Sequence, residues 1–454
     1  MRMILAIFIC KFSRLCLRML GRGGTNLPGK LALKCCPNLL AHLGKQVNTV
    51  VVTGTNGKTT TARMLEEAYK QAKISEFSNR SGANLLPGIT AEFTQHANIF
   101  GKMRKTHAII ECDEAAFRHV SKYLDAKIIL VTNVFRDQLD RYGEISHTLS
   151  SIRAGIDHSP NASICINADC PLLVQMVQGI HQPIYYFGAE ESLGQEAGKG
   201  MAEAARCPDC GATFTYHYKT YGHLGDFACP QCDYKRPERV VSVVKLLSST
   251  PDNSTVELNI GGNVAKATIN LPGVYNIYNA LGAVAVCHVL KMEVSHITAA
   301  LAKFQGGFGR MEAMTIGKTT ARMILVKNPI GATQVLEYLA AIEGKFQLVI
   351  CLNDQSGDGA DVSWIWDVET DAFEKMQENV TAVYCGGTRA DDLAVWLKYS
   401  SVLEEKIHLA YDMDTLLNTI AASDLPVYIM PTYTAMLELR GKLEKEHGLK
   451  RFWE

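Results

Sequence analysis

One short segment carries residue types that bind phosphate. Residues Gly54–Thr60 read GTNGKTT and follow Val47–Thr53, a β-branched run that predicts a strand, and an amphipathic helical pattern comes next. Glycines let backbone N–H groups turn toward phosphate oxygens, and the start of the helix adds its positive end. In such a loop Lys58 would contact the outer phosphates and Thr59 would bind Mg²⁺ through its hydroxyl. An ordinary glycine turn is the alternative, but the flanking strand and helix favour a nucleotide site.

Four cysteines form two pairs with the spacing of a metal site. Cys207 and Cys210 make one C-x-x-C pair, Cys229 and Cys232 make another, and eighteen residues lie between the pairs. Two tight C-x-x-C turns allow four thiolates to reach one tetrahedral Zn²⁺, and four protein ligands leave no open position for catalysis. The sequence therefore predicts a structural zinc ribbon. Two redox dithiols are the alternative, which two paired motifs in one insertion disfavour.

A third segment, Asn353–Asp367, places three carboxylates beside glycines and then two tryptophans. It follows Gln347–Leu352, an apolar run that predicts a strand, and ligand-binding groups in parallel sheets gather beyond the carboxyl ends of strands. A solvated acidic loop, followed by a helix with its tryptophans in the core, explains most of this segment equally well. The three carboxylates belong to Asp354, Asp358 and Asp361.

The bulk composition indicates a globular protein of several domains without an affinity for polyanions. The chain has 454 residues, more than one ordinary core, so two or three domains are expected. Hydrophobic residues make up 47% and charged residues 20%, which is typical of soluble globular proteins. The formal net charge is zero, so nothing at this level supports nucleic-acid binding. Most of the 14 cysteines stand singly in apolar runs, which favours a reducing cytosol over a disulfide framework.

The N-terminal segment Met1–Leu20 is apolar but is interrupted by basic residues. Lys11, Arg14 and Arg18 divide it, and the uncharged stretch Met3–Cys10 is too short to span a bilayer. A basic amphipathic helix is the better prediction. Packing of this helix on the protein's own surface is favoured over peripheral membrane contact, although a substrate held in a membrane would favour contact at its inner face.

Strand and helix patterns alternate along most of the chain, which predicts an α/β fold with mostly parallel sheets covered on both faces. Residues 192–238 are rich in Gly, Cys and Pro and are predicted to be an insertion, after which Val240–Ile269 returns to short strands around a turn at Gly261 and Gly262. A boundary near Met314–Ala321 precedes a second α/β unit. Further strands are predicted at His107–Glu111, Lys127–Asn133, Ser163–Asn167, Met323–Val326, Ala382–Cys385 and Val427–Met430.

The phosphate loop and several later segments, in the same order, resemble Mur ligases and folylpolyglutamate synthases. The segments are TGTNGKTT at 53–60, AIIECDE at 108–114, TNVFRDQLDRYG at 132–143, NAD at 167–169, GVYNIYNA at 273–280 and GRME at 309–312. The resemblance implies a helical N-terminal segment (1–45), a central ATP-binding domain (46–315) with the zinc ribbon inserted at about 200–238, and a C-terminal Rossmann-like α/β domain (316–454). It also implies ATP binding by Gly54, Asn56, Gly57, Lys58, Thr59, Thr60, Asn276 and Arg310, and Mg²⁺ binding by Thr59 and Glu111.

Three positions depart from the pattern of that family. Gln138 stands where the family has a histidine, so the resemblance gives no support for a second magnesium ion there. Ser151–Ile156 contains no lysine where many Mur ligases carry a carbamylated one. The third domain begins with Val326–Pro329 in place of the usual aspartate, so the binding of an amino acid as in standard Mur ligases is not supported.

Nearly the whole chain has a closer resemblance, to the MurT subunits of lipid II isoglutaminyl synthases. It is carried by the zinc ribbon within a Mur-like domain and by the segment NDQSGDGADVSWIWD at Asn353–Asp367. The resemblance implies a heterodimer with a GatD-like class I glutamine amidotransferase subunit, which has a cysteine and a histidine but lacks its own acidic third member. Asp361 best matches the aspartate that completes this triad, and Asp358 is the second choice. The acidic residue of such a triad orients the histidine while the cysteine attacks the amide of glutamine.

The function that this resemblance implies is ATP-dependent amidation in peptidoglycan synthesis. ATP would phosphorylate the α-carboxylate of D-glutamate in lipid II, and ammonia from glutamine would convert the acyl phosphate to D-isoglutamine. The implied cofactors are ATP, Mg²⁺ and Zn²⁺, and the implied location is cytoplasmic. Two alternatives stay open. One is an amino-acid-adding ligase of the folylpolyglutamate synthase type, and the other is a non-catalytic nucleotide-binding scaffold, which the Gln138 and Lys327 departures keep open.

Overall fold

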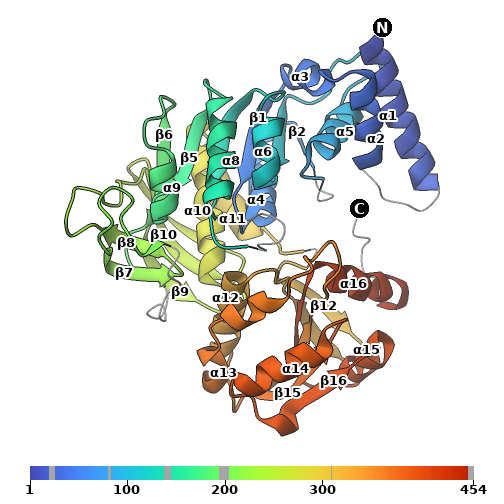
Figure 1. Ribbon diagram of the computed structural model, residues 1–454, viewed down its shortest axis with the longest axis vertical. Helices are drawn as coiled ribbons and strands as arrows, with labels where there is room; N and C mark the ends of the chain where they lie inside the picture. The colour runs from blue at the N-terminus through green and yellow to red at the C-terminus, as the bar shows by residue number, and fades with distance from the viewer. Residues whose placement is uncertain (20–25, 80–82, 138–144, 194–203, 308, 448–454) are drawn as a thin grey trace.

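A computed structural model describes residues 1–19, 26–79, 83–137, 145–193, 204–307 and 309–447. A helical N-terminal end, a large α/β unit and a second α/β unit follow one another along the chain (Figure 1). Among the described helices, none combines the length and the apolar character that crossing a membrane requires. The N-terminal end consists of α1 (Arg2–Met19), α2 (Asn26–Cys35) and α3 (Leu39–Gly44).

The first α/β unit is built on a nine-stranded sheet with the order β11-β10-β9-β6-β5-β4-β1-β3-β2. The strands from β2 to β6 in this order run parallel, and β9 joins β6 in parallel before turning into an antiparallel meander with β10 and β11. Because β1 lies between β3 and β4, the segments that follow all three strands meet at one edge of the sheet. The strands are β1 (Asn48–Thr53), β2 (Glu76–Ser78), β3 (His107–Glu111), β4 (Ala126–Val131), β5 (Ser163–Asn167), β6 (Ile184–Ala189), β9 (Val241–Ser249), β10 (Ser254–Ile260) and β11 (Asn263–Ile269).

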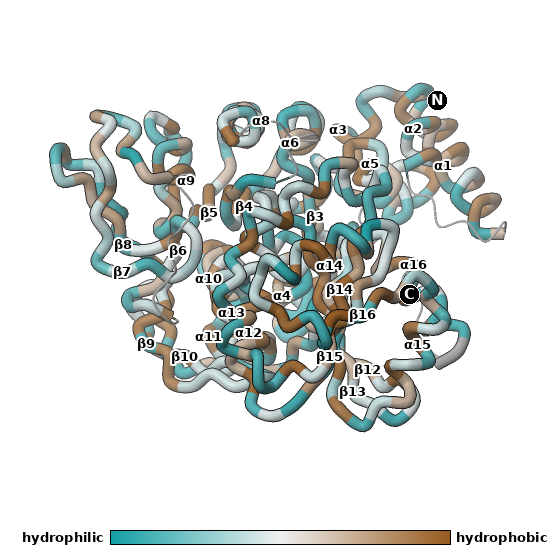
Figure 2. The backbone as a smooth tube through the Cα atoms, turned by 60° about the horizontal axis from the view of Figure 1, so that its bottom comes forward, coloured by the Kyte–Doolittle hydropathy of each residue, from teal (hydrophilic) through white to brown (hydrophobic). Residues whose placement is uncertain are grey.

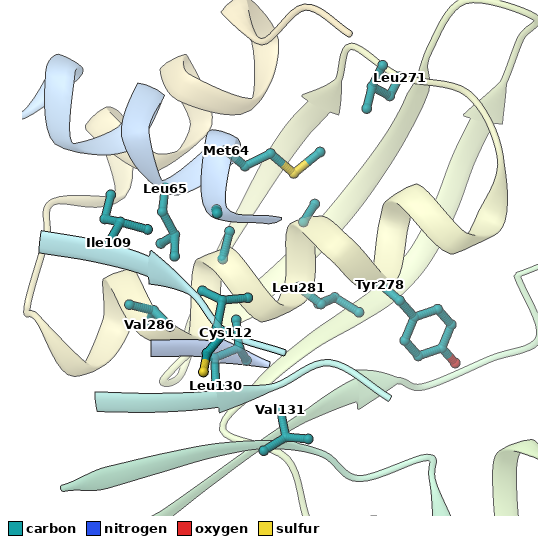
Figure 3. Packing of buried hydrophobic residues seen from close by; sticks show 14 of the residues in the cluster. Met64, Leu65, Ile109, Cys112, Leu130, Val131, Leu271, Tyr278, Leu281 and Val286 are labelled. Carbon is teal, nitrogen blue, oxygen red and sulfur yellow. The ribbon is translucent and has the colours of Figure 1, made fainter. Parts of the chain in front are cut away.

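Helices cover both faces of this sheet. Helices α4, α10 and α11 pack together on one face, while α6 packs against α8 and α8 against α9 on the other (Figure 1). In Figure 3, Leu65 of α4 and Val286 of α10 lie beside Ile109 of β3, and all three are buried. This packing holds the first turn of α4 at the end of β1. The helices are α4 (Lys58–Gln71), α5 (Leu86–His96), α6 (Glu114–Val120), α8 (Ile145–Asp157), α9 (Pro171–Met176), α10 (Val274–Val289) and α11 (Val294–Lys303).

The segment between β6 and β9 forms a small lobe with its own core. Its two antiparallel strands make a sheet separate from the large one, as expected for an insertion. Phe214, Phe227 and Tyr234 are buried together beside two of the four predicted zinc ligands. The aromatic cluster is small, so the lobe has little apolar area to bury on its own. The strands are β7 (Thr215–Tyr221) and β8 (Leu224–Ala228).

The second α/β unit has a six-stranded sheet with the order β12-β13-β17-β14-β15-β16. Its strands are parallel except for the β12–β13 hairpin at one edge. The chain moves from β14 outward to β16 and then returns to place β17 on the other side of β14, and open α/β sheets bind ligands where the order reverses in this way. The elements are β12 (Glu312–Ile316), β13 (Thr319–Met323), α12 (Pro329–Ala340), β14 (Phe346–Cys351), η2 (Ser363–Asp367), α13 (Asp371–Lys375), β15 (Val380–Gly386), α14 (Ala390–Tyr399), η3 (Glu404–Lys406), β16 (Ile407–Ala410), α15 (Met413–Ala421), β17 (Val427–Pro431) and α16 (Tyr433–His447).

The start of this second unit differs from the sequence prediction. The second sheet already begins at Glu312, a few residues before the predicted boundary, and the predicted strand Met323–Val326 is displaced because β13 ends at Met323. The residues of β13 alternate between buried and more exposed positions, as in a hairpin strand with one face covered, so the strand lacks the continuous apolar run that suggested the later position. The strands predicted around Gln347–Leu352, Ala382–Cys385 and Val427–Met430 are confirmed as β14, β15 and β17.

Candidate functional site

The phosphate loop turns at two glycines that must lack a side chain. Gly54 and Gly57 have φ angles of +120° and +85°, in the region that favours glycine. A Cβ at Gly57 would collide with the side-chain oxygen of Asn279, and a Cβ at Gly54 would collide with the hydroxyl of Thr132. The loop backbone can therefore lie directly against its neighbours.

The segment after β4 holds the loop in shape. The N–H of Thr55 donates to the carbonyl of Asn133 at 2.9 Å, and the N–H of Asn56 donates to Asn133 Oδ1 at 3.0 Å. Thr132 Oγ1 donates in turn to the carbonyl of Asn56 at 2.7 Å. The first two residues of the TNVFRDQLDRYG motif thus order the loop directly. Gln138 and the residues that follow it in that motif lie outside the described residues.

Lys58 is buried at the first turn of α4 and points back into the loop. Its ammonium group donates to the carbonyl of Gly54 at 2.6 Å and to Glu114 Oε1 at 2.8 Å. Burial by itself lowers the pKa of Lys58, but the carboxylates of Glu114 and Glu111 outweigh burial and raise this pKa above its ordinary value. The side chain is therefore a cation at neutral pH, in the position where a phosphate cradled by the loop would meet it.

Thr59 and Glu111, the two residues predicted to bind Mg²⁺, lie in contact. Thr59 Oγ1 donates to Glu111 Oε2 at 2.8 Å. Thr59 belongs to the first turn of α4, whereas Glu111 ends β3, the strand that pairs with β1. A hydroxyl and a carboxylate provide the oxygen ligands that Mg²⁺ prefers. The fold therefore brings the donor set together from segments that are about fifty residues apart in the sequence.

A cavity opens between the phosphate loop and the second unit, and Asn276 and Arg310 line it. The side-chain amide of Asn276 donates to the carbonyl of Pro272 at 2.7 Å, and Asn279 Nδ2 donates to Asn276 Oδ1 at 3.1 Å, so the orientation of Asn276 is fixed. Burial lowers the pKa of Arg310 from its ordinary value, as expected for a cation in a confined space. The predicted nucleotide-binding residues that line this cavity are Asn56, Gly57, Thr60, Asn276 and Arg310.

The second unit reaches the phosphate loop through Lys327 and Asn328, the segment that departs from the family pattern. Lys327 Nζ lies 2.6 Å from Asp137 Oδ2. Asn328 Nδ2 donates to Asn56 Oδ1 at 3.0 Å and to Asp137 Oδ1 at 3.4 Å, and Asn328 Oδ1 caps α12 by accepting from the N–H of Gly331. These bonds connect α12, the phosphate loop and the segment after β4.

The acidic loop after β14 gives its two candidate aspartates different environments. Asp358 is buried, and its carboxylate accepts hydrogen bonds from the backbone N–H and the hydroxyl of Thr434 at the start of α16. Asp361 is exposed and accepts from the N–H of Ser363 at 2.8 Å, and the hydrogen bonds from Ser363 hold the pKa of Asp361 below its ordinary value. Asp358 is thus occupied within the fold, whereas Asp361 presents an ionised carboxylate at the surface.

One interpretation of the sequence placed both tryptophans that follow this loop in the core, but only Trp364 is partly buried and packed against it. Ser363–Asp367 is a short 3₁₀ helix in which Ile365 is the buried residue. Trp366 is 53% exposed and its ring packs edge-on against Tyr399, which is 80% exposed. That interpretation is wrong for Trp366, because the register of the 3₁₀ turn directs Ile365 inward and Trp366 outward, which leaves an exposed aromatic ring five residues after Asp361.

The four cysteines meet in the inserted lobe. Cys207 Sγ lies 3.5 Å from Cys232 Sγ, and Cys210 Sγ lies 3.4 Å from Cys229 Sγ. All four sulfurs lie within 4.8 Å of one another. Four thiolates bound at about 2.3 Å to one tetrahedral ion would stand about 3.8 Å apart. The arrangement is therefore compatible with a single metal ion held by four sulfurs.

Sequence reasoning missed two residues that support the site. Glu114, which pairs with Lys58, stands three residues after Glu111 in the AIIECDE segment, and only Glu111 was given a role. Asp169, in the NAD segment, is fully buried and accepts hydrogen bonds from Arg236 at 3.0 Å and from the hydroxyl of Tyr278 at 2.6 Å. Asp169 thereby fastens the inserted lobe to α10. In both cases the sequence offered one signal, a carboxylate at the end of a predicted strand, within a motif that was already recognised.

Comparisons with known proteins agree with this geometry. The Mur ligase middle domain matches residues 52–212, and the MurT ligase C-terminal domain matches residues 325–436. The chain is 36% identical to the lipid II isoglutaminyl synthase (glutamine-hydrolyzing) subunit MurT of Streptococcus pneumoniae and 32% identical to that of Staphylococcus aureus, with 98% of both chains covered in each case. The chain belongs to the MurT family.

Solved structures support the same fold for this MurT family member. A pseudomurein peptide ligase type C from Methanothermus fervidus superposes with a TM-score of 0.65 at 19% identity, covering 88% of this chain and 79% of that one. MurF ligase from Thermotoga maritima, solved in complex with ADP, superposes with a TM-score of 0.63 at 16% identity, covering 91% of this chain and 84% of that one. The Mur-ligase-like α/β fold expected from the sequence is thus confirmed.

The contact between the two units yields a first prediction. Lys327→Met keeps the aliphatic stem but leaves the carboxylate of Asp137, which is only 10% exposed, without its 2.6 Å cation. We expect ATP turnover to fall about tenfold or more, because small displacements of positioning groups cost that much in rate. Steady-state turnover measures the effect, and Lys318→Met, at an exposed position of the same unit, is the control. Unchanged turnover in Lys327→Met would reject a role for this contact.

Proposed function

We propose that this chain is the ATP-dependent ligase subunit of a glutamine-dependent amidotransferase that converts the α-carboxylate of D-glutamate in lipid II to the amide of D-isoglutamine. The observation that carries the proposal is the phosphate loop, with Lys58 buried inside it and the Thr59–Glu111 pair beside it, in a chain whose MurT relatives are named lipid II isoglutaminyl synthase subunits. The product is a constituent of peptidoglycan, so the reaction belongs to cell-wall synthesis.

The phosphate loop and the adjoining cavity supply the groups that ATP requires. Backbone N–H groups of the loop and the positive end of α4 would hold the phosphates, while Asn276 and Arg310 would contact the nucleoside end. MurF of Thermotoga maritima, which shares the fold, was solved with ADP. When bound between Thr59 and Glu111, Mg²⁺ would supply positive charge to the β- and γ-phosphates. The proposed nucleotide-binding residues are Gly54, Asn56, Gly57, Lys58, Thr59, Thr60, Asn276 and Arg310.

The reaction follows from a carboxylate's poor reactivity toward ammonia. A carboxylate oxygen attacks the γ-phosphorus of ATP, the bond to the β-phosphate oxygen breaks, and ADP leaves. The nitrogen of ammonia then attacks the acyl carbon, phosphate leaves, and the nitrogen loses a proton. The ammonium group of Lys58 would face the position where charge grows on the transferred group, and its contact with Glu114 would limit the reorganisation it needs.

The source of ammonia in this proposal is a partner, a GatD-like glutaminase subunit, that docks on the second unit. Asp361 is suited to complete a cysteine–histidine pair because it is exposed and ionised, whereas the carboxylate of Asp358 is committed to Thr434. The exposed rings of Trp366 and Tyr399 support docking near Asp361, since exposed aromatic side chains are common at protein interfaces. The requirement for ATP favours the cytoplasmic face of the membrane for the complex.

The inserted lobe and the second unit have structural roles in this proposal. We propose that Cys207, Cys210, Cys229 and Cys232 hold one structural Zn²⁺, because their sulfurs lie within 4.8 Å of one another and the lobe's aromatic core is small. We also propose a division into domains of residues 1–45, 46–315 and 316–454, with the second sheet beginning just before the last boundary, at Glu312. A Rossmann-like character of the third domain is supported by the order of β14 to β17, which reverses at β14.

Removal of the loop cation tests the ligase chemistry. We expect Lys58→Ala to reduce amidation of lipid II about 100-fold or more with either glutamine or a high ammonium concentration, because phosphoryl transfer fails in both cases. Adding Glu114→Gln to this variant removes the buried negative charge that would otherwise lack its cation. Lys70→Ala, at a position 74% exposed on the same helix, is the control. Retention of ammonium-dependent amidation would contradict the proposed function.

Neutralising the exposed carboxylate tests the shared triad. In the complex with the glutaminase subunit, we expect Asp361→Asn to lower glutamine-dependent amidation about 1,000-fold or more while ammonium-dependent amidation stays unchanged, because only glutamine cleavage needs an oriented histidine. Asp354→Asn, in the same loop, is the control. Parallel assays with the two nitrogen donors provide the measurement. Equal loss with both donors would mean that Asp361 supports the fold or the ligase site instead.

Elemental analysis tests the metal. We expect one zinc ion per chain in the purified protein and less than half of that in Cys210→Ser, with Cys16→Ser, a free cysteine outside the cluster, as the control. Removal of the ion should lower the unfolding temperature of the chain, because the lobe has little apolar core to replace the metal bonds. A folded and active protein without zinc would refute this part of the proposal.

A further inference from the structure

Helix α1 presents a continuous row of large apolar side chains to solvent. The exposed residues follow one another at intervals of mostly three or four, so they lie on one face of the helix. Phe8 and Phe12 are 59% and 57% exposed, and their rings stack at 6.0 Å. The helix stands at the outer edge of the molecule (Figures 1 and 2). The row consists of Met1, Ile4, Leu5, Phe8, Phe12, Leu15 and Met19.

The opposite face fixes α1 to the body of the protein. Ala6, Ile7 and Cys10 are fully buried, and α1 packs against α2 and α5. Lys11 Nζ donates to the carbonyl of Ala97 at 2.6 Å, and Arg14 forms an ion pair with Glu92 at 3.2 Å. One face of α1 is therefore packed and hydrogen-bonded within the fold. The apolar row is a second face of the same helix, in addition to the one that the fold buries.

A neighbouring loop enlarges the apolar surface. Ile99 and Phe100 are 52% and 68% exposed, and the loop that carries them bends at Gly101, where φ is +82°. A Cβ at Gly101 would lie 2.7 Å from Met3 Cε, so this loop lies against the N-terminal part of α1. The apolar row on α1 is called the α1 surface below, and Ile99 and Phe100 add exposed apolar side chains beside the same helix. Apolar patches of this kind mark sites of protein or membrane contact.

The N-terminal segment that carries the α1 surface contains basic residues but no acidic ones. Residues 1–45 contain eight lysine and arginine residues and no aspartate or glutamate, in a chain whose net charge is zero. Arg14 is paired within the fold, and Arg22 lies outside the described residues. Such an excess of positive charge beside exposed apolar residues matches an anionic lipid surface. The exposed cations of residues 1–45 and of the neighbouring loop include Arg2, Arg18, Lys30, Lys34, Lys45 and Lys102.

We infer that the α1 surface is an interfacial anchor that inserts Phe8, Phe12 and their neighbours among the headgroups of an anionic membrane. The apolar row supplies the area that leaves water, and the surrounding cations supply the attraction to the anionic lipid. The inference deepens the proposed function, on which its biological purpose rests, because a ligase for lipid II must meet a substrate that is held in a membrane. Anchoring at α1 would keep the site near that substrate.

Vesicle co-sedimentation of the full chain, without ATP or substrate, tests the anchor. The probes are phosphatidylcholine vesicles with and without one third phosphatidylglycerol. We expect binding to the anionic vesicles at least tenfold tighter than to the neutral ones, and weaker in high salt. Phe8→Ser with Phe12→Ser should weaken binding at least tenfold, as should Lys30→Glu with Lys34→Glu. Val264→Ser, 60% exposed on β11, and Lys266→Glu are the matched controls.

Several outcomes would overturn the inference. One such outcome is equal vesicle binding by the wild type and by the Phe8→Ser, Phe12→Ser variant. Another is that the wild type binds no vesicles but self-associates, and that the variant loses this self-association. Activity separates this inference from the proposed function. The variant should amidate a muropeptide without a lipid tail at the wild-type rate and vesicle-borne lipid II at least tenfold more slowly. Failure of the wild type on both substrates would reject the proposed function and leave the vesicle result standing.

Discussion

The close approach of the Gly54–Thr60 backbone to β4 and α10 is the constraint on which the rest of the site depends. The loop fits between Thr132 and Asn279 only because Gly54 and Gly57 have no Cβ. That fit places the loop where Asn133 binds the N–H groups of Thr55 and Asn56 and where the ammonium group of Lys58 meets Glu114. Parallel strand order explains the convergence, since β3 and β4 flank β1 and each ends beside the loop. Residues far apart in sequence therefore meet without any long connection.

Elements with a strong sequence pattern of their own could be predicted. Elements that are short or half exposed, and features that depend on tertiary packing, could not. The strands His107–Glu111 and Ser163–Asn167 were predicted with their observed ends because strands buried on both faces are continuous apolar runs. Strand β2 (Glu76–Ser78) has three residues, and β16 (Ile407–Ala410) is half exposed, so neither carries such a run. Trp366 was misassigned to the core because the direction of a 3₁₀ turn follows from packing that the sequence pattern does not contain.

The candidate site divides in the same way. The residues of the phosphate loop and the cysteine pairs are adjacent in sequence, so their grouping needed no tertiary information, and the structure brings both groups together. The partners of these residues were not predictable, because they depend on packing between elements. Asp358 and Asp361 are a clear example. They differ by three positions and by nothing in type, yet one is buried under Thr434 and the other is exposed. Sequence reasoning left both open, and burial distinguishes them.

The buried charges also link nucleotide binding to the contact between the two units. A phosphate that drew the ammonium group of Lys58 away would weaken its pair with Glu114, and an uncompensated buried carboxylate is costly. Burial raises the pKa of Glu114, and the two cations that oppose this effect are Lys58 and, from the second unit, Lys327. Lys327 also pairs with Asp137, beside the loop. In that case Lys327 would be the remaining cation that opposes the effect of burial on Glu114, so the second unit contributes to the charge balance of the phosphate loop.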